Sequence, residues 1–520
     1  MKKVKQFLHL KLALMAILVM SALGACSSDN ENDGDTPNPP TGNTDPKVEY
    51  IGNIAHSKGL LFSEGKQLGN GDQNFVFTGK EVIKKGVYQM KGWVYIGEGA
   101  ELTIEPGTII KGDKQSKAAL IVERGGKLFA EGSVKEPIVF TSAQEAGQRK
   151  PGDWGGVIVC GKARNNQGSS MKIEGGPRSE HGGDNDDDNS GVLRYIRIEF
   201  AGYPFEKDKE INGLTLGSVG RGTKMDHIQV SYSNDDSFEW FGGSVNSKYL
   251  VAYNGWDDDF DTDNGFSGHI QFGLIVRDPK IADVSQSNAF ESDNAADGAE
   301  VSPFTSGVFS NITVIGPGTA KNRAAGYQNT SEYINGGQLN PNNGSGMGKF
   351  QAAIQLRRNS RLACHNSVFV GYPIGLILDG EKGNTVQQAK AGNIHLENLY
   401  FAGMDVIGTD ANKQYKDILG VYENGKITYD ESQSSYSSTF FKSITSNKVF
   451  EEDQLGLIDG RNEIGQNYIP KAGSVLLQGA NFSSIKSSFI TPVNYIGAFS
   501  GADDNWLDGW TNFDPQHANY

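Results

Sequence analysis

The chain has 520 residues, a net charge of −14 at neutral pH and 67 glycines. An acidic balance of this size argues against nucleic acid and anionic lipid headgroups as partners. There is no Gly-x-y period, which excludes collagen. The surplus of Gly beside Asn and Asp therefore predicts many tight turns and many short strands.

Residues 1–25 have the features of an export signal. Lys2, Lys3 and Lys5 form a basic head, the apolar stretch Leu12–Met20 is too short to span a bilayer, and small residues follow it. The sequence Leu23–Cys26 resembles a bacterial lipobox, which implies acylation of Cys26 and an anchor in outer-membrane lipid. The alternative is an ordinary signal peptide with an incidental Cys.

Residues 26–47 are predicted to be a disordered acidic tether, because Ser27–Pro46 has no apolar residue to bury. The acidic run after Cys26 resembles the surface-export signal of Bacteroidota lipoproteins, which implies display outside the outer membrane. A periplasmic spacer is the alternative. Without the four Lys of residues 1–25 the net charge becomes −18, which suits a secreted protein that holds divalent cations.

Residues 93–404 are predicted to form a solenoid of parallel strands. The segments Gly92–Gly112 and Arg124–Ser142 repeat one plan of short alternating strands broken by Gly, with no helical period between them. This pattern predicts an all-β fold, a single-stranded parallel β-helix, with residues 48–92 capping its first open edge. A β-sandwich is the alternative, but hairpin-paired strands do not repeat at a fixed period of this length.

Two sets of motifs carry a family resemblance. The runs LTIEPGTIIKG, LIVERGGKLFAEG and PGDWGGVIV resemble the opening of many secreted bacterial right-handed parallel β-helix proteins, the pectate-lyase-like solenoids. The runs IPKAGSVLLQGANF, YIGAF and NWLDGWTNF resemble the C-terminal signature of a family of secreted β-helix proteins from Bacteroidota and other bacteria. The resemblance implies fold and export, and it leaves the activity open.

The end of the chain and two insertions complete the predicted organisation. Residues 405–520 are expected to hold the last coils and a C-terminal cap, with Trp506 and Trp510 covering the last rung. The polar insertions Gly182–Asn189 and Gly318–Phe350 are predicted to form the walls of a groove.

Two cysteines remain once Cys26 is acylated. Cys160 and Cys364 would lie about nine rungs apart at about 4.8 Å per rung, far beyond the reach of a disulfide. Both are predicted to be small buried apolar residues.

One phrase recurs between Asn234 and Asn294, an aromatic residue followed by a carboxylate. It occurs at Phe238-Glu239, again 22 residues later at Phe260-Asp261, and again 30 residues later at Phe290-Glu291. Alternate side chains of a strand point to opposite faces, so the carboxylates stack outside the coil if the Phe rings stack inside. Like charges on adjacent rungs would then lie about 5 Å apart, which is unfavourable unless something neutralises them.

A hard cation with oxygen ligands would neutralise this column, and Ca²⁺ takes six to eight such ligands. The sequence therefore predicts a Ca²⁺ site. The alternative is a solvated acidic ridge with raised pKa values and loosely bound counterions. The predicted ligands are Asp235, Asp236, Glu239, Asp257, Asp259, Asp261, Asp263 and Glu291.

Two functions are compatible with this acidic face, ligand binding and catalysis. A binding protein would hold a glycan or another extracellular ligand, with Trp240 and Trp256 offering flat faces to sugar rings. The acidic turn DDDFDTD also resembles turns of β-helix pectate lyases, in which Ca²⁺ neutralises a uronate carboxylate and a base removes the C5 proton. Candidate bases for such a lyase are Lys248, Arg277 and Arg323.

A glycoside hydrolase similar to polygalacturonases is a weaker match. Its motifs occur here in the right order, with candidate catalytic residues Asp236, Asp257, Asp258 and His269 and the carboxylates one rung apart. However, the spacing to His269 and the spacing of the basic pair depart from that pattern. The leading expectation is therefore binding without chemistry by a surface lipoprotein whose partners are outer-membrane lipid, a polysaccharide and an outer-membrane importer.

Overall fold

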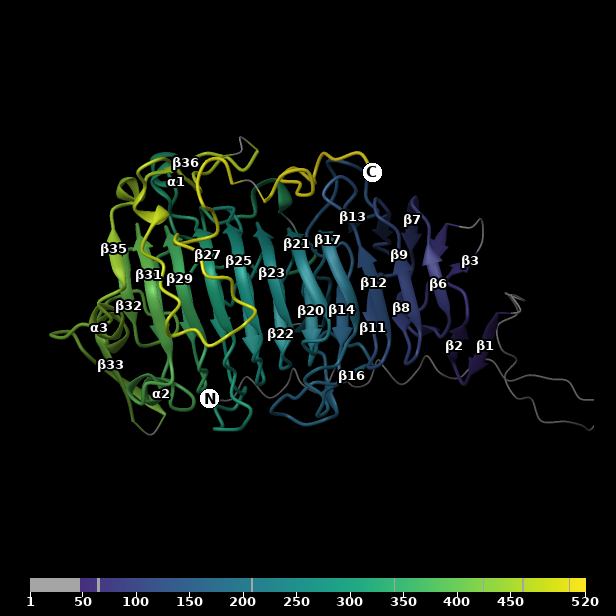
Figure 1. The fold of residues 1–520 in the computed structure, drawn as a ribbon, viewed down its shortest axis with the longest axis horizontal. Helices are drawn as coiled ribbons and strands as arrows, with labels where there is room; N and C mark the ends of the chain where they lie inside the picture. Colours follow the sequence, from purple (N-terminus) through teal and green to yellow (C-terminus); the bar gives the residue numbers. More distant parts are fainter. Residues whose placement is uncertain are drawn as a thin grey trace, which may run out of the picture. The chain divides into compact units, whose positions relative to one another are not determined.

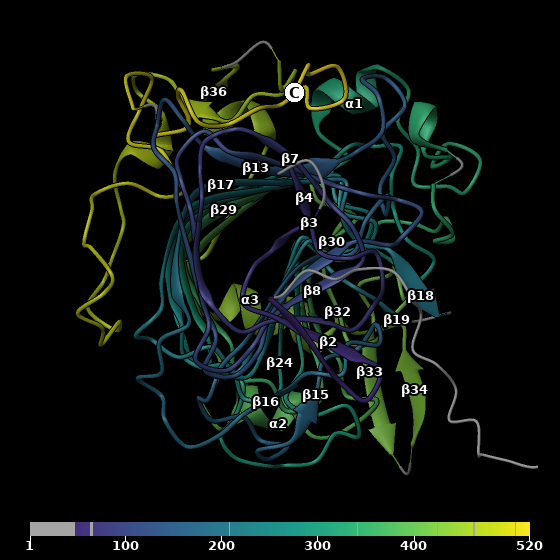
Figure 2. The ribbon, with the colours of Figure 1, turned by 90° about the vertical axis from the view of Figure 1, so that its right-hand side faces the viewer.

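The computed structural model describes residues 47–520 except 63–65, 207–208, 341, 424, 461–462 and 505. These residues wind into the predicted right-handed parallel β-helix, whose coils stack along the horizontal axis of Figure 1 and are seen end-on in Figure 2. The predicted export signal, Cys26 and nearly all of the predicted tether lie outside the described residues. Within the described residues, no helix is long and apolar enough to cross a membrane.

Two long sheets run along the coil. The first sheet contains, in spatial order, β1 (Val48–Ile51), β2 (Ile54–Ser57), β5 (Phe75–Phe77), β8 (Trp93–Ile96), β11 (Ala119–Val122), β14 (Gly156–Cys160), β20 (Leu214–Gly217), β22 (Phe238–Phe241), β24 (Phe260–Asp263), β26 (Phe290–Ser292), β28 (Ala352–Leu356), β30 (Ile374–Leu378) and β32 (Val406–Thr409). The second sheet contains β3 (Leu61–Phe62), β4 (Gln67–Leu68), β7 (Val87–Met90), β10 (Ile109–Gly112), β13 (Ile138–Ser142), β17 (Gly191–Glu199), β21 (Lys224–Ser231), β23 (Asn246–Tyr253), β25 (His269–Val276), β27 (Val308–Ile315), β29 (Ala363–Val370), β31 (His395–Ala402) and β35 (Lys448–Phe450). A side branch of β6 (Lys80–Ile83), β9 (Glu101–Ile104) and β12 (Lys127–Glu131) joins the second sheet at β17.

Parallel pairing begins earlier than the sequence predicts. The β1–β2 and β3–β4 ribbons at the start are antiparallel, but β5 already pairs in parallel with β8, and β6 with β9. The later part of the segment expected to cap the coil, residues 48–92, therefore belongs to the coil itself.

The long strands of the second sheet each turn a corner at one residue. β17 pairs with β12 up to Arg194 and with β13 from Ile196, so Tyr195 lies where two shorter strands merge into one. Such corner residues adopt a left-handed backbone conformation, with φ between 50° and 62°, which is uncommon for residues other than Gly. The corner residues are Tyr195, His227, Tyr249, Phe272, Asn311, Asn366 and Asn398.

The interior agrees with the predicted alternation. Phe238, Phe260 and Phe290 are fully buried, and consecutive ring centroids lie 5.6 and 5.4 Å apart. Burial of each ring contributes about 1.5–3 kcal/mol to stability. Cys160 and Cys364 are free and buried, which confirms the absence of a disulfide between them.

The last coil is covered by a helix rather than by tryptophans. Phe441 of α3 (Tyr436–Ser443) stacks on Phe401 of β31 with 4.2 Å between ring centroids. Trp510 instead packs against Tyr195 and His227 in the middle of the second sheet. The expectation that Trp506 and Trp510 cap the last rung is therefore wrong.

Residues 475–520 form a strap that runs back along the second sheet (yellow in Figure 1). Three amide side chains of the sheet each form two hydrogen bonds with the strap backbone, one as donor and one as acceptor. These bonds resemble those that a neighbouring strand would form. The pairs are Asn366 with Asn481, Gln271 with Thr491, and Gln229 with Asn512. Two shorter helices, α1 (Ala320–Ala324) and α2 (Thr385–Lys390), lie in insertions.

Candidate functional site

The acidic column exists as predicted. Glu239 on β22 pairs in register with Asp261 on β24, and Asp261 pairs with Glu291 on β26. The same outward row continues through Thr215 on β20 and Gln355 on β28, and the apolar residues Ile158 and Ile377 follow beyond them. Stacking follows from the coil itself, because parallel neighbours in register place equivalent side chains one strand spacing apart.

The column forms the floor of a groove of about 1160 Å³. Pro204 and Phe205 of β18 (Pro204–Glu206), which pairs with β19 (Lys209–Glu210), form one wall, and others come from residues 283–286, 343–346 and 412–413. The insertion Gly318–Phe350 thus supplies a wall as expected. Gly182–Asn189 does not line the groove, which corrects the second expectation.

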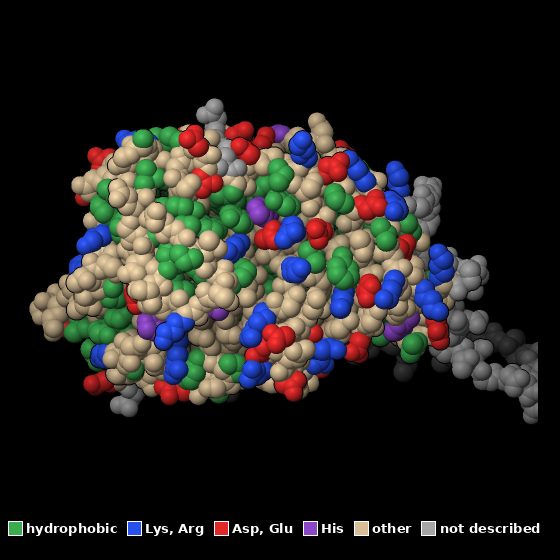
Figure 3. Space-filling view, viewed as in Figure 1, with side chains coloured by type: hydrophobic (Ala, Val, Ile, Leu, Met, Phe, Trp, Pro, Cys, Tyr) green, Lys and Arg blue, Asp and Glu red, His purple; other side chains and the backbone are tan. Residues whose placement is uncertain are grey.

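The groove concentrates negative charge. Its acidic lining residues are Glu174, Asp235, Asp236, Glu239, Asp257, Asp258, Asp261, Asp283 and Glu291. The face drawn in Figure 3, by contrast, carries Lys and Arg intermingled with Asp and Glu. Acidic residues are therefore more concentrated in the groove than on the face drawn in Figure 3.

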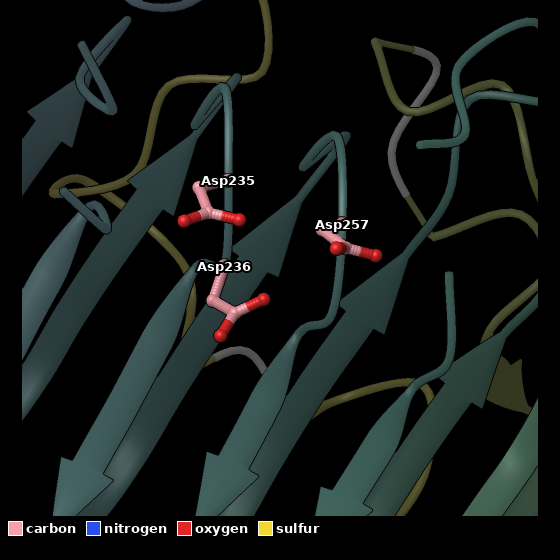
Figure 4. A group of neighbouring side chains, drawn as sticks. All are labelled: Asp235, Asp236 and Asp257. Atoms are coloured by element: carbon pink, nitrogen blue, oxygen red, sulfur yellow. The ribbon is translucent and has the colours of Figure 1, made fainter. Parts of the chain in front are cut away.

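Two carboxylate triads meet at Asp236 (Figure 4 shows the first). Asp235, Asp236 and Asp257 form one triad, and Asp236, Glu239 and Asp261 form the other, each with oxygen atoms within 4.8 Å of one another. Ca²⁺ binds oxygen at about 2.3–2.6 Å, so oxygens this close can reach one ion. Among the described residues, the buried Oδ1 atoms of Asp257 and Asp261 have no hydrogen-bond partner, and a bound cation could satisfy them. The donor set therefore fits Ca²⁺.

The carboxylates in and beside the column have raised pKa values. Burial, followed by repulsion from neighbouring acids, raises the pKa of Asp236, Glu239 and Asp261 well above the usual values. Burial likewise raises the pKa of Asp257 and Glu291 to about 7. A divalent cation would offset this repulsion and favour the charged forms.

Positive charge gathers at the β28 end of the groove. Arg357 binds Asp293 through two hydrogen bonds of 2.8 and 2.9 Å and also contacts Glu291. Burial lowers the pKa of Arg357, but these two carboxylates outweigh that effect and raise it well above its usual value. Arg358 and Lys413 line the same end. The groove is thus acidic along most of its length and carries cationic donors at one end.

Asp259 and Arg277 do not belong to the site. Both side chains are fully buried and form an ion pair of 3.0 Å, and Arg277 also donates to the backbone carbonyl of Asp257 at 2.7 Å. Burial raises the pKa of Asp259 to about 7 even with Arg277 beside it. Asp259 is therefore not placed to bind a groove cation, and Arg277 is not placed to act as a base. Both predictions are corrected.

The other predicted bases also lie elsewhere. Lys248 on β23 donates to Thr491 of the strap, and His269 at the start of β25 bonds to Asn246, so both belong to the second sheet. Arg323 forms an ion pair with Asp405. None of these lines the groove, and neither does Asp263, although burial and Asp293 raise its pKa. Asp236, Asp257 and Asp258 do line it.

The two predicted sugar-binding tryptophans are buried. Trp240 lies inside the coil and stacks on Phe238, with 5.9 Å between ring centroids. Trp256 is fully covered, packs against Leu339 and donates to the carbonyl of Gly346 at 3.2 Å. Neither offers a face to a ligand. Trp256 instead holds the groove wall in place.

Several lining residues were missed from the sequence, among them Arg357, Arg358, Lys413 and Gln355. A signal for Gln355 was present, because Ile354-Gln355 occupies the position of Phe290-Glu291 one coil later, with Gln in place of the acid. The two arginines follow it after one further residue. Lys413 comes from a segment far along the chain, and no repeat marks it.

Comparison with known proteins agrees with this architecture. No curated protein and no solved structure matches the chain significantly. A family model described as "Pectate-lyase like beta helix domain" matches residues 77–439, which is more than half of the chain. The chain therefore belongs to the family of pectate-lyase-like β-helix domains.

Proposed function

We propose that the groove binds an acidic extracellular polysaccharide in a Ca²⁺-dependent manner. The observation that carries the proposal is the pair of triads sharing Asp236, in which buried oxygens of Asp257 and Asp261 have no hydrogen-bond partner in the described part of the chain. A cation held there would have coordination positions left for a carboxylate of a sugar acid. Membership in the pectate-lyase-like family supports a carbohydrate-related role.

The charge of the groove favours an anionic ligand only when the cation is bound. Without it, the column would repel a sugar carboxylate, whereas the ion would bridge ligand and protein. The cationic donors Arg358 and Lys413 at the β28 end would meet further acidic units of the same chain.

A polysaccharide lyase is a second candidate, and Lys413 at the groove favours it. A lyase needs a base near the bound uronate, and the lysines and arginines predicted from the sequence lie outside the groove. A rise in ultraviolet absorbance during incubation with polygalacturonate, abolished by a chelator, would identify this activity. Binding with no new absorbance and no new reducing ends would identify a binding protein.

We further propose that acylated Cys26 anchors the protein in the outer membrane with the β-helix outside the cell, where it would pass its ligand to an importer. The lipobox resemblance of Leu23–Cys26 supports this location. The mass of the N-terminal peptide from membrane-bound protein, together with protease digestion of intact cells, tests it.

The substitution Asp236→Asn tests the cation site, because Asp236 belongs to both triads. In the wild-type protein, Ca²⁺ at about 100 times its Kd should stabilise the fold by about 2.7 kcal/mol. The variant should lose most of this gain, measured as the shift of the thermal midpoint between chelator and Ca²⁺. Asp503→Asn changes the same charge at an exposed position of the strap and should keep the full shift. An unchanged wild-type midpoint on adding Ca²⁺ would refute the site.

A further inference from the structure

The acidic column ends at an amide. Gln355 on β28 pairs in register with Glu291, so it continues the row of Glu239, Asp261 and Glu291 by one coil. It lines the groove, and its side chain is fully buried. At this position the row changes from groups that accept hydrogen bonds to a group that can also donate them.

A chain of hydrogen bonds fixes which way the Gln355 amide points. The backbone N–H of Lys413 donates to Oε1 of Gln351 at 2.6 Å, so the amide nitrogen of Gln351 lies on the other side. That nitrogen donates to Oε1 of Gln355 at 2.8 Å, which turns the nitrogen of Gln355 away from Gln351. Because a backbone N–H can only donate, neither amide can be reversed without losing a bond.

A second backbone group supports the same arrangement. The N–H of Ala352 donates to Oδ1 of Asn288 at 3.0 Å, and this oxygen also accepts from Gln351 at 3.3 Å. Two backbone donors from separate segments therefore hold the amide network in one orientation. Nε2 of Gln355 is left as a buried donor with no partner among the described residues. Such a group is unfavourable in a folded protein unless a ligand or a water accepts from it.

We propose that Gln355 is a ligand-recognition residue whose amide nitrogen donates to a carboxylate oxygen of the bound polysaccharide. The inference rests on the proposed function, because it assigns a subsite within the same groove. Arg358 and Lys413 line this end and can only donate, which favours an anionic acceptor over a hydroxyl group. Nε2 has almost no exposed surface, so contact with the ligand requires a small movement of the side chains that cover it.

The distance along the column requires more than one sugar unit. Gln355 lies two coils from Asp261, which corresponds to roughly 10 Å at about 4.8 Å per coil. One carboxylate group cannot reach both the cation triads and Gln355. The subsite therefore selects for a chain with acidic groups on separate units, one at the cation and another at Gln355.

The test measures binding of a galacturonate hexamer to the full protein in Ca²⁺ by calorimetry. Gln355→Met removes the donor and adds no charge, and we expect it to weaken binding about tenfold. Gln355→Glu adds repulsion at the same position and should weaken binding further. Gln73→Glu makes the same charge change at an exposed position outside the groove and should bind like the wild type. The fully methyl-esterified hexamer should bind poorly to every form.

The outcomes separate the two proposals. Wild-type affinity in Gln355→Met, with Ca²⁺ binding and the circular dichroism spectrum unchanged, would overturn the role of Gln355 and leave the groove as the binding site. Weak binding in Gln355→Glu alone would show charge repulsion without donation and would also overturn it. No binding of the hexamer to the wild-type protein in Ca²⁺ would overturn the proposed function and this inference together.

Discussion

At the scale of single residues, neighbouring carboxylates have different roles because their side chains leave the backbone in different directions. Asp261 faces outward from β24 into the groove, whereas Asp259, which precedes β24, is paired with Arg277 out of contact with solvent. The two residues lie close in sequence and carry the same charge. Their environments, and hence the effects of removing them, are opposite.

Asp259→Asn should destabilise the protein strongly. The substitution leaves Arg277 buried without a counterion, and breaking a buried ion pair in this way costs about 3–5 kcal/mol. Asp261→Asn is the matched comparison, because it removes one of several mutually repelling acids and should stabilise the metal-free protein. Both effects are measured by denaturant unfolding in chelator at pH 8. Equal stability of Asp259→Asn and the wild type would contradict the structural role of the pair.

At the scale of elements, the stacking of β22, β24 and β26 makes stability depend on pH. Burial raises the pKa of Asp257 and Glu291 to about 7 and raises those of Asp236, Glu239 and Asp261 well above the usual values of about 4 in the unfolded chain. A raised pKa means that the folded state binds protons more tightly. Its stabilising contribution is complete below about pH 4 and is lost as the pH rises through about 7 and beyond.

The metal-free protein should therefore unfold at a lower temperature at pH 8.5 than at pH 5.5. Ca²⁺ should reverse this trend, because it binds the deprotonated carboxylates and so stabilises the fold more at the higher pH. Thermal scans with chelator and with Ca²⁺ at the two pH values check both statements. A metal-free midpoint that rises with pH would show that the column is not the dominant titrating feature.

The elements also show what the sequence could predict. The coil and its acidic column follow from local periodicity, because the spacing of Phe238, Phe260 and Phe290 fixes both the register and the inward face. Trp240 lies two residues after Phe238, so the same alternation predicts that it points into the coil. The alternation therefore argues against the predicted contact of Trp240 with a sugar. Asp259 was not predictable in this way, because it lies in the bend before β24, where the alternation of a strand does not apply. Lys413 comes from a distant segment, so only tertiary structure reveals it.

At the scale of the whole β-helix, the strap connects coils that are distant from one another along the stack. In a plain solenoid each repeat contacts only its neighbours, and stability is nearly a sum of local terms. Here the outer face of the second sheet is apolar under the strap, where Leu274 and Val370 belong to one buried cluster with Phe499, Trp510 and Phe513. Residues 475–520 thus provide a second core outside the coil and connect coils that do not otherwise touch.

Weakening the amide pairs should uncouple the strap from the sheet. Gln271 and Gln229 are buried, and each exchanges two hydrogen bonds with the strap backbone, at Thr491 and Asn512. The double substitution of both glutamines by Met keeps their length but leaves these backbone groups unpaired, at a cost of about 1–3 kcal/mol for each site. Hydrogen exchange at the amides of the strap should accelerate, and the unfolding transition should broaden as distant coils lose their connection.

Gln387→Met on the exposed side of α2 is the control and should leave both measurements unchanged. Strap exchange that stays as slow as in the wild type would mean that apolar packing alone holds the strap. Faster strap exchange with a transition that remains sharp would mean that coupling between coils passes through the sheets. Either outcome would contradict the coupling of distant coils through the amide pairs of the strap. Only the combination of fast exchange and a broadened transition supports a strap that joins distant coils through its amide pairs.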